Sequence, residues 1–255
     1  MADKPIIYDR FSCNNCADTS SLDFGFTMAF QPIVNCQTNK IFGYEALVRG
    51  LKNESAFSIL SRVNDENRYF FDQLCRVKAI KLASKLQIAS ILSINFLSKS
   101  IYEPERCIRT TLKAAKTFNF PTERIMFEFT EAEKIEDPSF LKQIIECYKT
   151  MGFKTAIDDF GSGYSGLGLL ANFQTHIVKF DIELIRNINQ DKPRQCIIKN
   201  CLNLFHNLNI TPLAEGVETK AEMVWLRDAG IELMQGYLFA KPLLEKLPHV
   251  DFSRI

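Results

Sequence analysis

KTAIDDFGSGYSGLG, the stretch from Lys154 to Gly168, sets the interpretation of the whole sequence. Its apolar beginning ends in two adjacent acids, Asp158 and Asp159, and a turn containing four glycines follows. Burying two neighbouring carboxylates without a partner is costly, and a bound cation removes that cost. The stretch therefore predicts a strand that delivers two acids to a metal ion, followed by a mobile loop.

Strand-like and helical patterns alternate on both sides of this stretch. Helical periodicity covers 67–87, 104–119, 137–152, a region reaching 207, and 219–230, and the apolar strand-like runs between these segments are 26–34, 40–49, 91–96, 124–130, 154–159, 176–181, 210–215 and 231–235. The first two runs flank a short turn and predict a hairpin. Strands alternating with helices predict an α/β fold with a mostly parallel sheet, and the number of strands approaches that of a closed barrel.

Composition narrows the class of protein. The chain has 255 residues with 31 Lys and Arg against 30 Asp and Glu, a net charge of +1. This balance argues against a nucleic-acid or membrane-surface binder, and no apolar run reaches the roughly 18 residues that span a bilayer. Without a signal-peptide pattern we expect a cytoplasmic protein, in which its 8 cysteines stay reduced.

The first 24 residues are polar, and we expect them to form a leader ahead of a barrel over residues 25–255. Cys13 and Cys16 form a C-x-x-C in this leader. The pair is compatible with half of a zinc site, a redox pair or no function, because no second metal-binding pair accompanies it. We expect the two cysteines to be dispensable for activity.

Polar side chains recur at the ends of the apolar runs. They are Asn95, Glu128, Asp158, Asp159, Lys179, Glu215 and Gln235. In a βα barrel these strand ends form the catalytic rim, and seven polar residues there are hard to explain by packing alone. Glu45 and Arg49 share one face of the second strand. A simple ion pair across this face, with no function, is the alternative explanation for their presence.

Carboxylate and amide oxygens suit a hard cation such as Mg²⁺ or Mn²⁺ better than zinc. The glycine turn also matches G-x-G-x-x-G, the phosphate-binding signature of nicotinamide enzymes. We reject that interpretation, because two carboxylates directly before the turn would repel a pyrophosphate. No Ser-His-Asp or Cys-His arrangement is present.

Seven separated motifs resemble, in order, the EAL-domain phosphodiesterases that hydrolyse the bacterial second messenger cyclic di-GMP. They are Glu45-Ala46-Leu47 with Arg49, Asn95, Glu128 to Glu131, Asp158 to Gly161, Lys179 with Asp181, Ala214 to Glu218, and Gln235 to Tyr237. The stretches 44–50 and 102–109 are most similar to EAL domains that are free-standing or linked to blue-light sensors. Gly50 departs from the pattern, since many members have tryptophan there.

The resemblance implies a TIM-like (β/α)8 barrel with an antiparallel first strand and two Mg²⁺ or Mn²⁺ ions. Its implied metal ligands are Glu45, Asn95, Glu128, Asp158, Asp159 and Glu215, with Lys179, Glu215 and Asp159 as the catalytic groups. Its implied substrate contacts are Gln31, Leu47, Arg49, Gln235 and Tyr237. Glu131 and Glu218 would orient these groups, Glu131 by holding the loop that contains Gly161 and Ser162.

The expected reaction is hydrolysis of cyclic di-GMP to linear pGpG, with calcium inhibitory and no flavin or nicotinamide in this chain. The resemblance also implies a homodimer and a separate sensor or regulator protein. The alternative is a catalytically silent protein that binds cyclic di-GMP or another protein. Because the motif positions are intact, we favour the enzyme.

Overall fold

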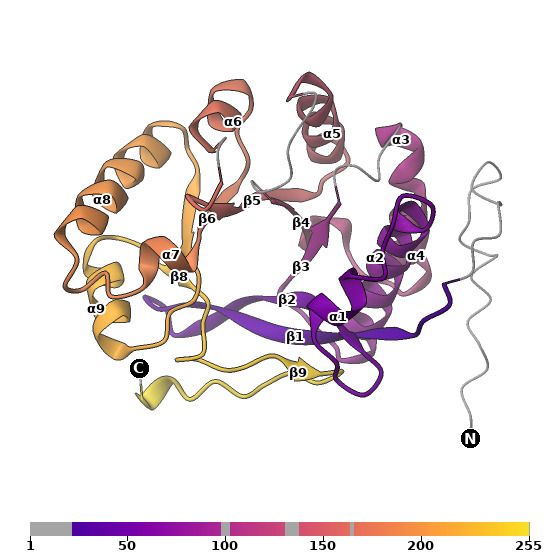
Figure 1. The fold of residues 1–255 in the computed structure, drawn as a ribbon, viewed down its shortest axis with the longest axis horizontal. Helices are drawn as coiled ribbons and strands as arrows, with labels where there is room; N and C mark the ends of the chain where they lie inside the picture. Colours follow the sequence, from indigo (N-terminus) through magenta and orange to yellow (C-terminus); the bar gives the residue numbers. More distant parts are fainter. Residues whose placement is uncertain (1–21, 98–102, 131–137, 164–165, 255) are drawn as a thin grey trace.

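Eight strands close into a barrel in the computed structural model of the protein, which describes residues 22–97, 103–130, 138–163 and 166–254 (Figure 1). The strands of the barrel are β1 (Phe26–Asn35), β2 (Lys40–Gly50), β3 (Ile91–Phe96), β4 (Ile125–Thr130), β5 (Lys154–Phe160), β6 (Ile177–Phe180), β7 (Thr211–Ala214) and β8 (Leu233–Met234). Neighbours from β2 to β8 are parallel, and β1 closes the ring by pairing antiparallel with both β2 and β8. The prediction of a TIM-like (β/α)8 barrel with an antiparallel first strand is confirmed.

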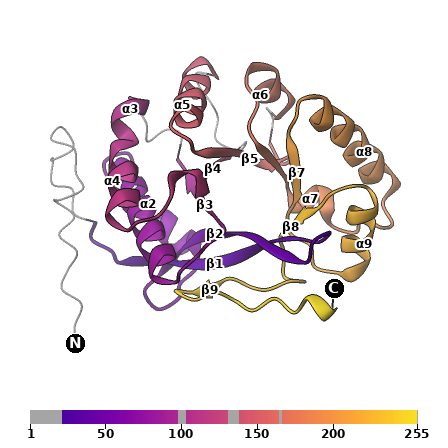
Figure 2. The ribbon, with the colours of Figure 1, turned by 180° about the vertical axis from the view of Figure 1, so that it is seen from behind.

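Helices surround the strands on the outside of the barrel (Figures 1 and 2). They are α1 (Ala56–Leu60), α2 (Arg68–Lys85), α3 (Pro104–Cys107), α4 (Arg109–Thr117), α5 (Pro138–Thr150), α6 (Gly166–Asn172), α7 (Ile182–Ile185), α8 (Lys192–Asn207) and α9 (Lys220–Asp228), with short 3-10 turns η3 (Thr122–Arg124) and η4 (Phe252–Arg254). Most of the buried apolar side chains lie between this helical layer and the outer face of the strands. They form the main hydrophobic core of the protein.

A second, smaller apolar cluster fills the interior of the barrel at the amino ends of its parallel strands. Its buried members, which we call the lower layer, are Ile33, Met126, Ala156, Ile177, Leu213 and Leu233. They come from β1, β4, β5, β6, β7 and β8, so one short cluster joins most of the ring. The barrel is therefore a packed core at this end and leaves its other end for polar side chains.

The structure adds details that periodicity did not give. The helix expected over 104–119 is two helices, α3 and α4, which meet at the buried Ile108. The short helix α1 and a two-residue strand, β9 (Leu243–Leu244), were not predicted. The loop expected as far as Gly168 is shorter than predicted, because α6 begins at Gly166. β9 pairs with Ala29 and Phe30, whereas β8 pairs with Val34 and Asn35, and Pro32 lies in the gap between them, where its missing N–H leaves no hydrogen bond unmade.

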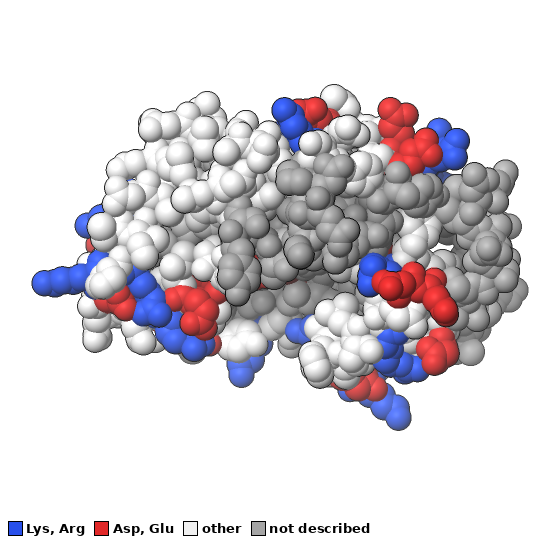
Figure 3. All heavy atoms as spheres, turned by 45° about the horizontal axis from the view of Figure 1, so that its top comes forward, with Lys and Arg blue, Asp and Glu red and all other residues white. Residues whose placement is uncertain are grey.

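Two further observations bear on the charge and location expected from the sequence. Basic and acidic side chains are interspersed on the face drawn in Figure 3, so the described residues there offer no continuous basic surface. Within the described ranges, no helix has both the length and the apolar character that a bilayer crossing needs. Cys13 and Cys16 lie outside the described residues, so their role stays a prediction.

Candidate active site

A polar layer lies at the carboxyl ends of the strands, directly next to the lower layer. Each segment from β4 to β8 contributes one apolar residue to the lower layer and a polar residue two positions later. The pairs are Met126 and Glu128, Ala156 and Asp158, Ile177 and Lys179, Leu213 and Glu215, and Leu233 and Gln235. Because side chains two residues apart point to the same face of a strand, strand periodicity brings all five polar groups into the barrel.

Lys179 is the centre of the polar layer. Its side chain is fully buried, and its Nζ lies 2.6 Å from Glu215 Oε1. The same nitrogen lies 2.9 Å from Glu128 Oε2 and 2.9 Å from Asp158 Oδ1. A fourth carboxylate oxygen, Oε2 of Glu45, lies 3.7 Å away. One ammonium group therefore faces four carboxylates from four different strands or strand ends.

The charges in this layer strongly perturb one another. Burial opposes the charge of Lys179, but the carboxylates around it, Asp158 foremost, raise its pKa well above the ordinary value. Burial raises the pKa values of Glu128 and Glu215 well above their ordinary range despite the opposing effect of Lys179. Burial, reinforced by the charge of Asp158, raises the pKa of Asp159 to about 6. Lysine alone does not balance the acids, so the layer favours additional positive charge.

Neutral side chains hold two of the acids in place. The Asn95 amide nitrogen donates to Glu45 Oε1 at 2.7 Å, and the Gln235 amide nitrogen donates to Glu45 Oε2 at 2.7 Å. The hydroxyl of Ser93 donates to Glu128 Oε1. Ser93 was not predicted, although its place two residues before Asn95 on a strand marks it as another inward-facing polar residue. These bonds fix the direction in which the carboxylate oxygens point.

Two groups of acids have the geometry of metal sites. Glu45, Glu128 and Asp158 form one, and Asp158, Asp159 and Glu215 form the other; in each, one oxygen per residue lies within 4.8 Å of the others. The donors are all oxygens, which hard cations such as Mg²⁺ and Mn²⁺ prefer, and Asp158 belongs to both groups. The residues present therefore fit divalent cations, which these carboxylate oxygens would hold.

The backbone at Asp159 is unusual for a residue with a side chain. Its φ is +54°, in the left-handed region, and Gly161 follows with φ +100°. The Ser162 N–H and hydroxyl both donate to the Asp159 carbonyl oxygen, at 3.0 and 2.9 Å. This tight turn separates Asp158, which is buried, from Asp159, which is half-buried. Adjacent acids thereby reach different sides of the same site.

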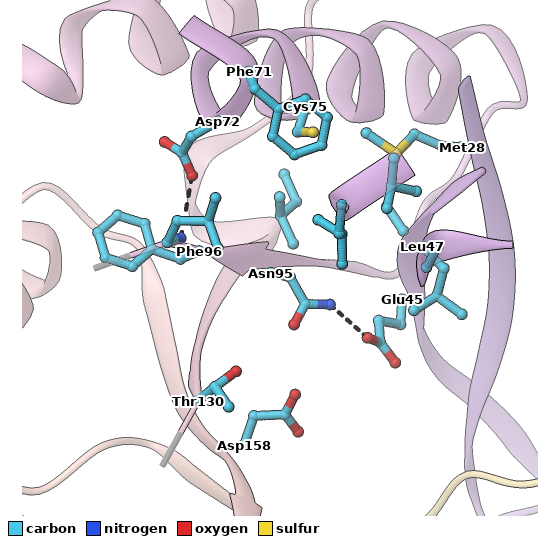
Figure 4. Close-up of a pocket in the computed structure, with 16 residues that line it drawn as sticks. Met28, Glu45, Leu47, Phe71, Asp72, Cys75, Asn95, Phe96, Thr130 and Asp158 are labelled. Carbon is cyan, nitrogen blue, oxygen red and sulfur yellow. Dashed lines mark hydrogen bonds between the residues drawn. The ribbon is translucent and has the colours of Figure 1, made fainter. Parts of the chain in front are cut away.

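A cavity of about 340 Å³ opens on each side of Glu45. The first is mostly apolar, with Leu47, Phe71 and Cys75 among its lining residues, and also contacts Asn95 and Asp158 (Figure 4). The second, called the polar cavity below, is lined mainly by residues with polar side chains. They are Gln31, Glu45, Asp159, Asp181, Glu215, Glu218, Gln235 and Tyr237, together with Ile182, Gly216 and Gly236. The acidic layer therefore lies between two separate spaces, one apolar and one polar.

Comparison with protein families gives the same result as the motifs. A family model described as the EAL domain matches residues 20–242, most of the chain. This chain belongs to the EAL domain family.

Similar proteins include free-standing and sensor-linked EAL domains. This chain is 34% identical over 240 residues to the blue light- and temperature-regulated antirepressor BluF of Escherichia coli. The match covers 93% of this chain and 59% of BluF. A standalone versatile EAL protein from Vibrio cholerae, solved in a cyclic di-GMP-bound form, is 70% identical with a TM-score of 0.89, covering 91% of this chain and 99% of that one.

A manganese and cyclic di-GMP complex of Klebsiella pneumoniae BlrP1 is also similar. It is 33% identical with a TM-score of 0.82, and the match covers 90% of this chain and 59% of BlrP1. The chain thus spans less than two thirds of BluF and of BlrP1, while it matches nearly all of the Vibrio protein. The predicted resemblance to free-standing and blue-light-sensor-linked EAL domains is confirmed.

The predicted substrate residues of this EAL domain are not all in the same environment. Leu47 lines the apolar cavity, and Gln31, Gln235 and Tyr237 line the polar one, Tyr237 with 56% of its surface exposed. Arg49 lines neither cavity, and its guanidinium donates to the Val48 carbonyl oxygen at 2.7 Å. Its role at the substrate stays a prediction.

Other predicted residues are only partly described. Glu131 lies outside the described residues, so its proposed hold on the loop after Asp159 stays a prediction. Glu218 lines the polar cavity, and its backbone N–H is tied to the Glu222 carboxylate. Asp72 was missed: it lies on α2, lines the apolar cavity, and accepts the Leu97 N–H at 3.2 Å. In the sequence, Asp72 and Arg76 have the spacing of an ordinary helical ion pair, so nothing indicated that Asp72 lines a cavity at the site.

Proposed function

We propose that this EAL domain hydrolyses cyclic di-GMP to the linear dinucleotide pGpG with the help of two divalent metal ions. The observation that carries the proposal is the pair of acidic groups that share Asp158 around the Lys179 ammonium. When bound, two such ions would supply Lewis acidity and lower the pKa of a shared water molecule. The proposed ligands are Glu45, Asn95, Glu128, Asp158, Asp159 and Glu215.

Lys179 would act as a fixed cation in this reaction. Despite its burial, the surrounding carboxylates raise its pKa well above the ordinary value in the metal-free protein, which supports a role as a charged ammonium rather than as a general base. It is already held in a buried position, so it would stabilise negative charge that develops on a phosphoryl oxygen without reorganising. Asn95 and Gln235 would keep the Glu45 carboxylate in place during the reaction through their hydrogen bonds to it.

The two cavities support a substrate with two bases and a phosphodiester between them. The apolar cavity with Leu47 suits the face of one base, and the polar cavity offers the Tyr237 ring for the other. A phosphodiester placed between them would lie against the acidic layer that both cavities share through Glu45. Arg49 is the proposed phosphate clamp, since its planar guanidinium can bind two phosphate oxygens at once.

The test is turnover of cyclic di-GMP in Mg²⁺ or Mn²⁺, followed by chromatography of the products. We expect pGpG as the first product, loss of turnover in excess chelator, and binding with little turnover in Ca²⁺ because its larger, looser coordination shell positions water poorly. Glu45→Ala and Asp158→Ala should lose both metal binding and turnover. Undiminished hydrolysis in excess chelator would refute the metal-dependent mechanism.

A second candidate function is binding without turnover. It is favoured by the name of BluF, an antirepressor, which describes action on another protein rather than catalysis. Calorimetry separates the two candidates. Tight binding of cyclic di-GMP with no product after prolonged incubation in Mn²⁺ would favour this second function over hydrolysis.

The proposal extends to assembly and location. We propose a homodimer in the cytoplasm that responds to a separate sensor or regulator protein, with a leader ahead of the barrel. The leader expected over residues 1–24 ends earlier than predicted, because Phe24 is buried in the main core against Phe71 of α2. Light scattering of the purified chain tests the dimer. Co-purification from cells, with and without residues 1–21, tests whether the leader contributes to a regulatory contact.

A further inference from the structure

We propose that Glu222, on α9 and outside both cavities, is a positioning residue that holds the acidic turn after β7 against the acidic turn after β5. The consequence for metal binding rests on the proposed function, whereas the structural part does not. Glu222 is 3% exposed, which is rare for a glutamate that pairs with neither lysine nor arginine among the described residues.

The Glu222 carboxylate does more than an ordinary helix cap. The sequence predicts a capping box with Thr219, and the structure has one: the Thr219 hydroxyl accepts the Glu222 N–H, and the Thr219 N–H donates to Glu222 Oε2 at 2.9 Å. A capping box of this kind satisfies two backbone donors. Here Oε2 also accepts the Glu218 N–H at 3.1 Å, and Oε1 accepts the Asn187 N–H at 2.8 Å.

The third donor connects α9 to a distant segment. Asn187, 35 residues earlier in the chain, has φ +59° and lies two residues after α7. α7 and α9 lie on the same side of the barrel in Figures 1 and 2. One carboxylate therefore ties the segment 218–219, which follows Glu215, to the end of α7.

α7 in turn packs against both acidic turns through two glycines. A Cβ built on Gly216 would lie 2.3 Å from Ile182 Cγ1, and one built on Gly161 would lie 2.3 Å from Leu184 Cδ1. Gly216 directly follows Glu215, and Gly161 follows Asp159 by two residues. The acids of the second metal group, apart from Asp158, thus stand on two turns that contact the same short helix.

Glu222 therefore fixes the end of α7 relative to the turn after β7. While its hydrogen bonds are intact, the turn after β7, α7 and the turn after β5 have fixed relative positions, and so do the Glu215 and Asp159 carboxylates. Without them, Glu215 keeps the hydrogen bond from its N–H to the Phe180 carbonyl oxygen, but the residues after it are no longer tied to α7. We expect metal affinity to fall more than substrate affinity.

The test compares Glu222→Gln with Asp251→Asn, its control. Both changes replace a carboxylate that accepts a backbone N–H near the start of a helical segment by its own amide. Asp251 accepts the Ser253 N–H at 3.1 Å near η4 and lines neither cavity. Three measurements are made on the full chain: amide hydrogen exchange, calorimetric binding of Mn²⁺ alone, and steady-state kcat and KM for cyclic di-GMP over a series of metal concentrations.

For Glu222→Gln we expect faster exchange at residues 187 and 216–219 and metal binding weakened by about 10-fold. This is the lower end of the range for losing a direct partner of a metal ligand, because Glu222 bonds the turn and not a ligand side chain. KM at saturating metal should change less than the metal requirement. Asp251→Asn should leave exchange at these residues, metal binding and kcat as in the wild type. Wild-type exchange and wild-type metal affinity in Glu222→Gln would overturn the proposal and reduce Glu222 to a helix cap.

A second variant keeps the test decisive if Glu222→Gln does not fold. Leu184→Ala removes the contact of α7 with Gly161 without touching the capping box, and should weaken Mn²⁺ binding in the same direction. If the wild type proves unable to hydrolyse cyclic di-GMP, the proposed function fails while exchange and calorimetry still decide the role of Glu222. Unchanged metal affinity in Leu184→Ala would contradict the role of α7.

Discussion

The lower layer and the polar layer inside the barrel are made by the same strands, two residues apart, and their energetics are opposite. In the lower layer, apolar side chains such as Met126 and Ile177 leave water and stabilise the fold. In the polar layer, Glu128 and Lys179 are equally buried but carry charges whose removal from water is expensive. The comparison shows that each of these strands contributes both to stability and to the site. Its residue in the lower layer stabilises the fold, and its residue two positions later supplies the polar group.

The largest expected effect comes from removing the one cation of the polar layer. Lys179→Met leaves the Glu128, Asp158 and Glu215 carboxylates without a counter-charge, and breaking a buried ion cluster costs about 3–5 kcal/mol. We expect this loss in the free energy of unfolding in chelator, and turnover lowered by about 10²–10³-fold, as for other preorganised charge-stabilising groups. Added Mg²⁺ should restore more stability to the variant than to the wild type.

The control for this change is Lys142→Met. Lys142 is exposed and its Nζ lies 3.8 Å from Glu146 on α5, so the change should cost less than about 1 kcal/mol. Denaturant unfolding with and without metal measures both variants. Equal stability of Lys179→Met and the wild type in chelator would mean that the polar layer is not held together by this lysine.

The next prediction concerns the lower layer. Met126→Ala empties part of the lower layer, and truncating a buried methionine to alanine typically costs about 2–5 kcal/mol. We expect the melting temperature to drop while Mn²⁺ affinity, measured calorimetrically well below the melt, stays as in the wild type. Met126→Leu conserves volume and should cost less than about 1.5 kcal/mol. Metal affinity that falls in parallel with stability would show that the two layers are not separable.

A smaller effect concerns pH at the amino end of the barrel. His176 Nδ1 accepts the Thr155 N–H at 3.1 Å, and burial, followed by the charges of Lys149 and Lys154, lowers its pKa below the ordinary 6.5. The unfolded chain therefore binds the proton more tightly, so this contribution is complete above pH 6.5 and is lost as the pH falls below it.

The measurement is the free energy of unfolding in chelator between pH 7.5 and 5.5, compared with His176→Gln. The variant should be less stable at pH 7.5 and should lack the part of the acid destabilisation that His176 causes. In the polar layer the buried acids have raised pKa values, so acidification acts there in the opposite sense. An identical pH profile in both proteins would show that protonation of His176 does not affect the free energy of unfolding.

The smallest expected effect lies outside both layers. Cys13→Ser with Cys16→Ser should leave turnover, metal affinity of the barrel and melting temperature unchanged, because these cysteines precede the barrel pattern and lack partner ligands within the sequence motif. Elemental analysis of the wild type and the variant provides the check. A stoichiometric zinc content that disappears in the variant would contradict the prediction.

Strand periodicity and position carried most of the information about the site. Asp158 follows an apolar run directly, and Glu128 has the period of two that points it to the same face as Met126. What the sequence could not give depends on contacts between distant residues. β9 is only two residues long, and its pairing with Ala29 exists because the chain returns to β1 after more than 200 residues.

Buried pairs on the helices were also beyond prediction. Asp72 and Arg76 form an ion pair with nearly no exposed surface, and the Arg76 guanidinium lies 4.7 Å from the centre of the Phe96 ring. In the sequence the two residues are an ordinary i, i+4 pair that is typical of a solvated helix face. The bond from Asn187 to Glu222 is another case, because only the first-turn part of the capping box has a local signature.

The closure of the barrel through β1 has a consequence for how the protein is made. β1 and β2 can form their hairpin as soon as they leave the ribosome. The other edge of β1 stays unpaired until β8, which begins at Leu233, and β9, which begins at Leu243, have been synthesised. At translation rates of about 5–20 residues per second, those roughly 200 residues take on the order of 10–40 s. During that time the nascent chain exposes an apolar strand edge, of the kind that pairs with other chains. Of all the strands, β1 spends the longest time incomplete, which makes it the segment where we expect chaperones to be needed during synthesis.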